Sequence, residues 1–245
     1  MNILASIQDY LQKKVSISSE RPVVEAYDIW SASYDEQPGN LMLDLDSQIF
    51  SSLITGICIE NKQIADIGCG TGRHWKLLYE RFPATITGYD VSPGMLSRLR
   101  QKFPAGISHQ VTDNLLMDVP ASSADLIITT LTVAHIENIN EALASWARIL
   151  KDGGNLVITD FHPATLAKGG KRSFTQDGKT YSVKNYVHPL NEIIATLMHH
   201  RFHLIKKEER FVDESVKSYY EDQHALPVYN KFKGMPIIYG IHLTK

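Results

Sequence analysis

The 245-residue sequence contains only two cysteines, Cys58 and Cys69, and has no long apolar run. Two cysteines cannot build a disulfide framework. A membrane span needs about 18 consecutive apolar residues, and no stretch approaches that length. Residues 1–10 also lack the basic start and the apolar stretch of a secretory signal. We therefore expect a cytoplasmic, soluble protein that does not act at a membrane.

Signatures of metal binding and of nucleic-acid binding are also missing. No C-x-x-C or H-E-x-x-H pattern occurs, so we expect no metal site. The 25 Lys and Arg residues are balanced by 27 Asp and Glu residues, and the net charge of −2 leaves no basic surface for nucleic acid. The length suits one domain with additional segments, and it is sufficient to bury a full core.

From residue 62 onward, apolar strand-like segments alternate with amphipathic helices. The expected strands cover residues 63–67, 85–89, 106–111, 124–130 and 155–159. The expected helices cover residues 73–81, 93–102 and 141–150. Strands and helices that alternate at this spacing indicate an α/β fold with a parallel, doubly wound sheet. The strands are nearly all apolar, which is typical when helices cover both faces of a sheet.

Other segments flank this alternating region. Helical patterns over residues 1–14 and 21–60 predict an N-terminal helical lid, which leaves residues 61–245 as the main domain. Residues 163–190 predict an insertion after the fifth strand, with a hairpin turn at Asp177-Gly178. Beyond the insertion, we expect a helix over residues 191–200 and strands over residues 203–211 and 236–243.

A glycine-rich turn follows the first expected strand, in the sequence Ala-Asp-Ile-Gly-Cys-Gly-Thr-Gly of residues 65–72. Glycines at positions 68, 70 and 72 allow the backbone to turn sharply and to lie against a ligand. The helix that follows would add free N–H groups and a partial positive charge. A dinucleotide fingerprint has a third glycine at the position that Arg73 occupies here. The turn therefore predicts a nucleotide-like ligand other than a dinucleotide.

Three acidic residues stand at the ends of expected strands, namely Asp66, Asp90 and Asp113. Ligands of open α/β sheets bind outside the carboxyl ends of the strands, so we expect these carboxylates to lie near one cleft. For each acid taken alone, the alternative is a helix cap or a loop residue.

Together these motifs resemble the class I S-adenosylmethionine-dependent methyltransferases over residues 62–161. Residues 131–136 resemble the family's loop after the fourth strand, and residues 148–154 resemble its R-x-L-K-P-G-G turn. Asp152 replaces the usual proline in that turn, which affects the turn rather than the pocket. The resemblance implies a Rossmann-like sheet of seven strands whose last strand is antiparallel and lies beside the sixth.

The resemblance also implies a binding site for S-adenosylmethionine. Asp90 would accept hydrogen bonds from the ribose hydroxyls, and Asp113 with the N–H of Asn114 would bind adenine. Asp66 would hold the glycine turn or the cofactor's ammonium group. The other expected contacts are Gly68, Cys69, Gly70, Gly72, Val91, Met95, Thr130 and Leu131.

Two Tyr-Asp pairs in the N-terminal region, at Tyr27 and Tyr34, resemble a stretch that precedes the core in many small-molecule methyltransferases. In that interpretation both tyrosines belong to a lid that touches the cofactor. The alternative is a surface helix with aromatic packing.

A methyl group on a sulfonium is already a strong electrophile, so catalysis depends chiefly on alignment. Positioning alone can supply about 7–11 kcal/mol of the barrier, and no catalytic triad is needed. His162 and His135 follow the fifth and fourth strands and are candidates for a general base. For His135 we favour the alternative, a hydrogen bond to the backbone below the site.

The loop after the fourth strand disfavours a nucleic-acid substrate. DNA and RNA amino-methyltransferases of this family carry N-P-P-Y or D-P-P-Y there, whereas residues 129–133 are Thr-Thr-Leu-Thr-Val. The expected lid and insertion favour a small-molecule acceptor, in a monomer or a homodimer. Two alternatives stay open: an enzyme of this fold that performs a different reaction, and a cofactor-binding protein without catalysis. The presence of every cofactor motif argues against the second.

Overall fold

The computed structural model describes residues 19–113 and 115–245, so the helix expected over residues 1–14 lies outside the described residues. Seven strands form the central sheet in the order β4-β3-β2-β5-β6-β10-β9. They are β2 (Gln63–Ile67), β3 (Thr85–Asp90), β4 (Ile107–Gln110), β5 (Ala124–Thr130), β6 (Leu150–Phe161), β9 (His203–Phe211) and β10 (Pro236–Thr244). Strands β2 to β6 are parallel, and β10 runs antiparallel between β6 and β9. The predicted Rossmann-like sheet with an antiparallel last strand is confirmed.

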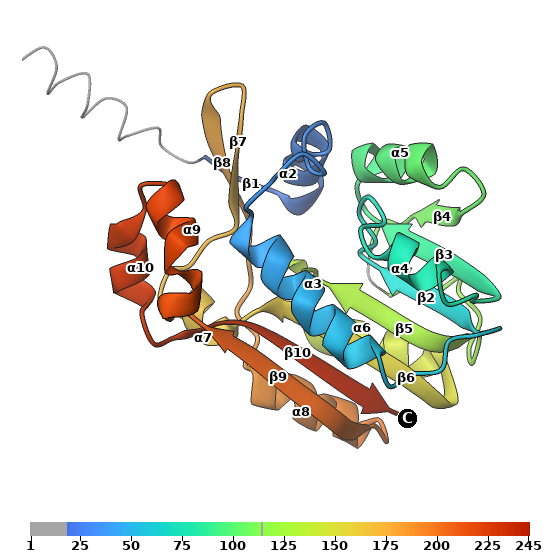
Figure 1. Cartoon of the computed structure of the whole chain (residues 1–245). Helices are drawn as coiled ribbons and strands as arrows, with labels where there is room; N and C mark the ends of the chain where they lie inside the picture. The colour runs from blue at the N-terminus through green and yellow to red at the C-terminus, as the bar shows by residue number, and fades with distance from the viewer. Residues whose placement is uncertain (1–18, 114) are drawn as a thin grey trace, which may run out of the picture.

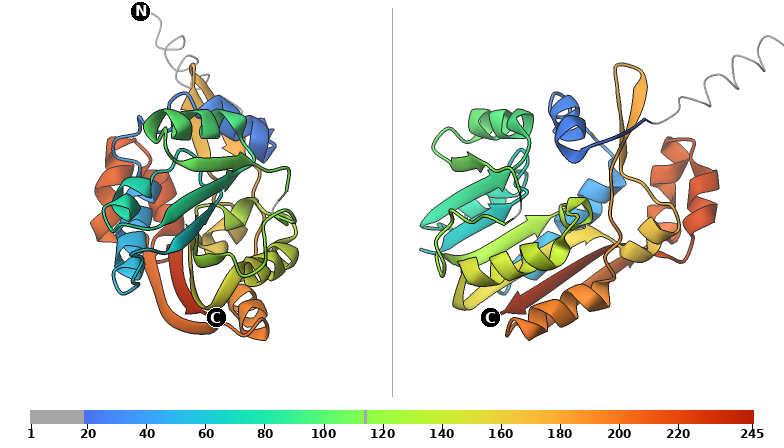
Figure 2. Two further views of the ribbon diagram at one scale, coloured as in Figure 1. Left: turned by 90° about the vertical axis from the view of Figure 1, so that its right-hand side faces the viewer. Right: turned by 180° about the vertical axis from the view of Figure 1, so that it is seen from behind.

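Helices cover both faces of this sheet (Figures 1 and 2). On one face lie α3 (Leu41–Ile54), α4 (Trp75–Tyr79) and α5 (Pro93–Lys102). On the other lie α6 (Ile139–Ile149) and α8 (Leu190–His199). Leu126 and Ile128 of β5 join the core on the α3 side, while Ile127 joins the core on the α6 side. Since side chains alternate along a strand, burial of both faces explains why β5 is apolar at consecutive positions.

Helix α3 belongs to the core rather than to a lid. It packs on β6, β9 and β10, and its Ile49 and Leu53 are almost fully buried. The approach is closest at Gly240 of β10, where a Cβ atom would overlap Ile49 and would lie 2.9 Å from Leu53 Cδ1. Residues 41–54, which we expected to belong to a lid, therefore pack in the core.

The segment before α3 combines with the insertion into a separate unit, which we call the cap (Figure 1). The cap consists of α2 (Val23–Trp30) and a small sheet of β1 (Ser19–Arg21), β8 (Lys179–Val183) and β7 (Ser173–Gln176), in the order β1-β8-β7. Trp30 of α2 stacks on Phe174 of β7, with ring centroids 4.5 Å apart. The hairpin turn expected at Asp177-Gly178 joins β7 to β8, and both residues have positive φ.

A hydrogen-bonded junction holds the cap to the core. Asp28 of α2 accepts hydrogen bonds from the N–H of Gly94, at 3.0 Å, and from the hydroxyl of Ser92. Because Ser92 is the N-cap of α5, one carboxylate of the cap contacts the N-terminus of a core helix, where negative charge is stabilising.

Three short helices complete the fold: α7 (Pro163–Ala167), α9 (Lys217–Asp222) and α10 (Leu226–Phe232). The sequence pattern did not indicate α9 and α10, which connect β9 to β10. None of the helices in the described part of the chain is long and apolar enough to cross a membrane.

Candidate functional site

A cleft lies at the carboxyl ends of β2, β3 and β5, bordered by α2 of the cap. Its floor includes the glycine turn after β2, the end of β3 and the loop after β5. Tyr27 and Tyr34 contribute to its lining from the cap side. The cleft therefore occupies the position where open α/β sheets bind their ligands.

The glycine turn is held in place by backbone hydrogen bonds. The N–H groups of Gly68 and Cys69 donate to the carbonyl of Tyr89, at 2.8 and 3.2 Å. Gly68 has a φ of +70°, and a Cβ atom there would overlap the side chain of Thr132. Gly70 has a φ of +52°, but no atom lies within 4 Å of the position where its Cβ would stand. Gly68 is thus needed for close packing, whereas Gly70 leaves open space beside the cleft.

Asp90 lies beside this turn at the end of β3. Its carboxylate accepts hydrogen bonds from the N–H groups of Gly70, at 2.7 Å, and Ser92, at 2.8 Å. Burial raises the pKa of Asp90 above its ordinary value, while these N–H groups act in the opposite direction. A carboxylate has about four acceptor positions, so Asp90 retains capacity for two further donors from a ligand in the cleft.

Asp66 supports the turn from within the core. Its carboxylate accepts a hydrogen bond of 2.7 Å from the indole N–H of Trp75, which begins α4. Burial raises the pKa of Asp66 to about 7, although the bond from Trp75 lowers it. Asp66 thereby links β2 to α4 on either side of the glycine turn.

Tyr27 and His135 connect the cap to the loop after β5. The Tyr27 hydroxyl lies 2.9 Å from Nε2 of His135, and His135 Nδ1 lies 3.0 Å from the carbonyl of Lys184. Burial lowers the pKa of His135 to about 4, and the positive charge of Arg172 acts in the same direction. His135 is therefore neutral at pH 7, and both of its ring nitrogens are engaged.

Residues 65–158 match the family described as the methyltransferase domain. This stretch of the chain is a domain of the class I S-adenosylmethionine-dependent methyltransferase type. S-Adenosylmethionine is the methyl donor that is typical of this family.

Individual relatives of this methyltransferase domain agree with the family match. The biotin biosynthesis bifunctional protein BioHC of Cellvibrio japonicus is 27% identical over 186 residues, which cover 76% of this chain and 35% of that protein. The malonyl-[acyl-carrier protein] O-methyltransferase of Methylococcus capsulatus is 31% identical over 143 residues, with 56% and 52% covered. The chain thus spans 35% and 52% of the length of these two relatives.

A solved structure shares the fold of this chain. The complex of the Haloferax volcanii Trm112 methyltransferase activator with a methyltransferase matches with a TM-score of 0.67 and 15% identity. The match covers 91% of this chain and 96% of that one.

Most of the site residues expected from the sequence line the cleft. They are Tyr27, Tyr34, Gly68, Gly70, Asp90, Val91, Met95, Thr130, Leu131 and His135. Asp66, Cys69 and Gly72 do not line it and support the turn from the core. Asn114 lies outside the described residues.

Two other expected site residues are not among those that line the cleft. Asp113 is exposed, and its carboxylate accepts a hydrogen bond from the N–H of Leu115. His162 is the N-cap of α7, and its Nε2 lies 3.0 Å from Glu209 of β9. It borders a different surface depression, formed with α8 and β9, so the structure does not bring it to the glycine turn.

Sequence reasoning did not single out several residues that line the cleft. They are Val23, Val24, Ile67, Tyr89, Val111, Thr132 and Ile136. Most of them are neighbours in the sequence of residues that were identified. Their positions at strand ends could have indicated that they line the cleft. Val23 and Val24 had no such signal, because they reach the cleft only through the way in which α2 lies over it.

Proposed function

We propose that this protein transfers the methyl group of S-adenosylmethionine to a small-molecule acceptor that binds beside the cap. The main support is one juxtaposition: Tyr34 lines the cleft with Asp90 and also hydrogen-bonds Arg172, which lines a second pocket. Two neighbouring pockets that share a wall suit a reaction between two bound molecules, one in each pocket.

The residues of the cleft fit the methyl donor. Asp90 would accept hydrogen bonds from the ribose hydroxyls, since its carboxylate has unused acceptor capacity. The backbone around Gly70 would lie against the methionine end, because the space beside it is open. Val91, Met95 and Leu131 would surround the apolar faces of the adenine.

When bound, S-adenosylmethionine supplies a methyl group on a positively charged sulfur, which takes the electron pair of the broken S–CH₃ bond as the acceptor bonds to carbon. The protein's contribution is to align the acceptor and to exclude water, and alignment can supply about 7–11 kcal/mol. Tyr27 and Tyr34 would exclude water from the cap side of the cleft. We assign His135 a positioning role through Tyr27, because both of its nitrogens are already engaged.

The test combines calorimetry with isotope labelling. We expect S-adenosylhomocysteine to bind with measurable heat, and its failure to bind would refute the cofactor site. A panel of small metabolites is then incubated with donor that carries a deuterated methyl group, and products are analysed by mass spectrometry. A product that contains the labelled methyl supports the proposal. Turnover that yields only unlabelled product would instead establish a different reaction on this fold.

The Asp90→Ala variant is the matched control for this experiment. It should lose both the binding of S-adenosylhomocysteine and the labelled product. Labelled product that persists in this variant at the parent's rate would place the reaction outside the cleft.

A further inference from the structure

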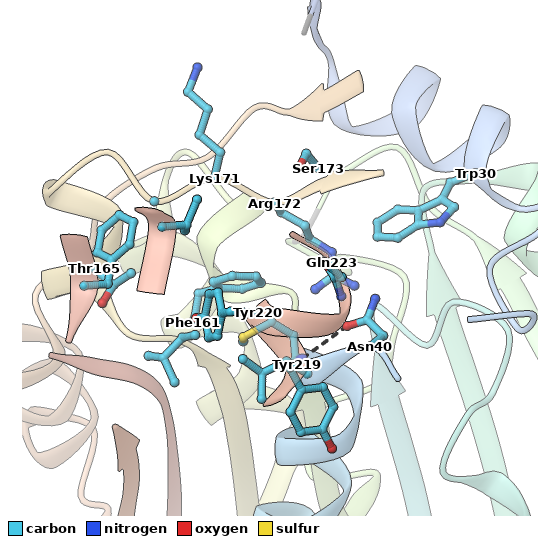
Figure 3. Close-up of a pocket in the computed structure, with 16 residues that line it drawn as sticks. Trp30, Asn40, Phe161, Thr165, Lys171, Arg172, Ser173, Tyr219, Tyr220 and Gln223 are labelled. Atoms are coloured by element: carbon cyan, nitrogen blue, oxygen red, sulfur yellow. Dashed lines mark hydrogen bonds between the residues drawn. The ribbon is translucent and has the colours of Figure 1, made fainter. Parts of the chain in front are cut away.

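The second pocket lies where the cap meets α3, α9 and α10 (Figure 3). Its walls include five aromatic side chains, namely Trp30, Phe161, Tyr219, Tyr220 and Phe232. Asn40, the N-cap of α3, contributes a polar edge. The pocket can therefore contact an apolar group through its aromatic rings, while Asn40, Ser173 and Gln223 add polar groups beside Arg172.

Arg172 is the unusual residue of this pocket. It follows the insertion's Lys171 and is only 3% exposed. Its Nη2 donates a hydrogen bond of 3.2 Å to the hydroxyl of Tyr34. Its Nε and Nη1 atoms are buried and have no hydrogen-bond partner. A guanidinium has five N–H donors, and three of them belong to these two unpartnered nitrogens.

Aromatic rings surround this guanidinium but do not neutralise it. Its carbon lies 5.0 Å from the centroid of Trp30, 5.6 Å from that of Phe161 and 5.9 Å from that of Tyr27. Such contacts stabilise a cation only modestly compared with an ion pair. Among the described residues, no carboxylate forms an ion pair with Arg172.

The negative charge of the nearby Asp160 favours the charged form of Arg172, but the two side chains do not form an ion pair within 4.0 Å. The two carboxylate oxygens of Asp160 accept hydrogen bonds from the N–H groups of Ala134 and Phe161, at 2.7 and 2.6 Å. The lining of the second pocket contains Lys171 and Arg172 but no Asp or Glu. A buried charge without an ion pair and with two unpartnered nitrogens is costly, so this lining favours a ligand that carries a negative charge.

We propose that the second pocket binds the acceptor and that Arg172 recognises a carboxylate on it, so that the substrate is an amphipathic carboxylic acid. This rests on the function proposed above. A guanidinium presents its donors in a planar fork that matches a carboxylate, and charge-assisted bonds of this kind are the strong ones. The aromatic walls would hold the apolar part of the acid.

The position of Arg172 also relates the carboxylate to the reaction. Its partner Tyr34 lines the cleft of the methyl donor, and so does Tyr27, over which the guanidinium lies. A carboxylate bound at Arg172 therefore lies at the wall between the two pockets. The acceptor would be oriented by its charged end, with the methylated atom near that end rather than at the far end of the apolar body.

The test uses matched probes with the protein saturated by S-adenosylhomocysteine. The probes are 3-phenylpropionate and its uncharged primary amide, which differ only in the recognised group. We expect the acid to bind at least about tenfold more tightly, the lower end for a hydrogen bond to a charged group. In Arg172→Met this preference should disappear. Equal binding of the two probes, no binding of either, or a preference that survives in Arg172→Met would overturn the proposal.

Lys171→Met is the control, since Lys171 adjoins Arg172 and lines the same pocket, but its ammonium points away from the other labelled side chains in Figure 3. The Lys171→Met variant should retain the preference for the acid over the amide. Loss of this preference in Lys171→Met would show that the positive charge of the pocket as a whole, rather than Arg172, attracts the acid. Arg172→Met should also melt no lower than the parent, because it removes a buried charge that forms no ion pair. A melting temperature several degrees lower would indicate a structural role instead.

These outcomes are independent of those for the proposed function. If S-adenosylhomocysteine binds but the acid and the amide are equivalent, only the assignment of Arg172 fails. If the acid binds through Arg172 but no labelled methyl is transferred to any acceptor, the assignment of Arg172 is supported and the proposal of methyl transfer is refuted.

Discussion

Tyr27 and His135, which are 108 residues apart in the sequence, are joined by a hydrogen bond of 2.9 Å between the Tyr27 hydroxyl and His135 Nε2. The direction of this bond follows from the other ring nitrogen. The Lys184 carbonyl can only accept, so Nδ1 of His135 carries the proton, and Nε2 accepts the proton of Tyr27. A neutral histidine thus ties the cap to the core at the rim of the cleft.

The energy of this link can be measured with a double-mutant cycle of Tyr27→Phe and His135→Phe. Both substitutions keep an aromatic ring and remove the hydrogen bond. We expect a coupling of about 0.5–1.5 kcal/mol in the free energy of unfolding, the usual net value of one hydrogen bond. A cycle of Tyr27→Phe with His203→Gln, an exposed histidine on β9, should give a coupling near zero. Equal couplings in the two cycles would contradict the link.

The same histidine predicts a loss of stability in mild acid. Burial lowers the pKa of His135 to about 4, below its value in the unfolded chain. The unfolded state therefore binds more protons as the pH falls through about 6.5, and the stability that comes from the neutral ring is lost progressively down to about pH 4. Between pH 7 and pH 5, this loss should be at most about 2 kcal/mol.

Urea unfolding at pH 7 and pH 5 checks this prediction. The parent should lose more stability than His135→Phe across this interval, because other titrating groups contribute equally to both proteins. The same acid sensitivity in the two proteins would show that His135 does not titrate in this range.

Gly70 and Gly178 offer a matched pair for testing where the methyl donor lies. Both have positive φ, and both would place a Cβ in open space. Substitution by Ala should cost each protein about 1–2 kcal/mol of backbone strain. Only Gly70→Ala should also weaken the binding of S-adenosylhomocysteine, by about tenfold or more, because its methyl group enters the cleft. Calorimetry that finds equal affinities for the two variants would remove Gly70 from the binding surface.

Substitutions at Asp90 and Asp113 can distinguish a residue that contacts the ligand from one that only stabilises a loop. Asp90→Asn should weaken the binding of S-adenosylhomocysteine by roughly 1.5–3 kcal/mol, the range for hydrogen bonds to a charged group. Asp113→Asn should leave the affinity unchanged, since that carboxylate is exposed and binds the N–H of Leu115. Weaker binding in Asp113→Asn together with unchanged binding in Asp90→Asn would contradict this prediction and support the expectation that Asp113 binds adenine. Thermal melting of both variants checks that each is folded.

The sequence predicted the central sheet well because its signals are local. Residues 63–67, 93–102, 124–130 and 203–211 were assigned with the bounds that the structure has. Each of these segments carries its own periodicity, and turn residues flank it. The acid at the end of β3 and the glycine turn were found for the same reason, since strand ends of a parallel sheet meet at one edge.

Long-range packing explains what the sequence could not predict. The apolar stripe of α3 shows that the helix is buried, but it does not show that Gly240 of β10 receives it. His162 follows a strand as an active-site residue would, yet the start of α7 directs it to Glu209. Arg172 lies in a polar insertion where a basic residue is ordinarily solvated, but α2 of the cap and Phe161 of β6 pack against it.

The place of β10 between β6 and β9 has a consequence for biosynthesis. Among the described strands, β9 pairs with β10 alone, and β10 is the later of the two in the chain. Residues 63–161 emerge from the ribosome before β9 and β10 and can form the parallel strands. Strand β9 cannot join them until residues 236–244 have been made. Until then the twelve-residue β6 is an open edge, and such edges pair with other chains. Nascent chains that stall before Pro236 should therefore aggregate through β6.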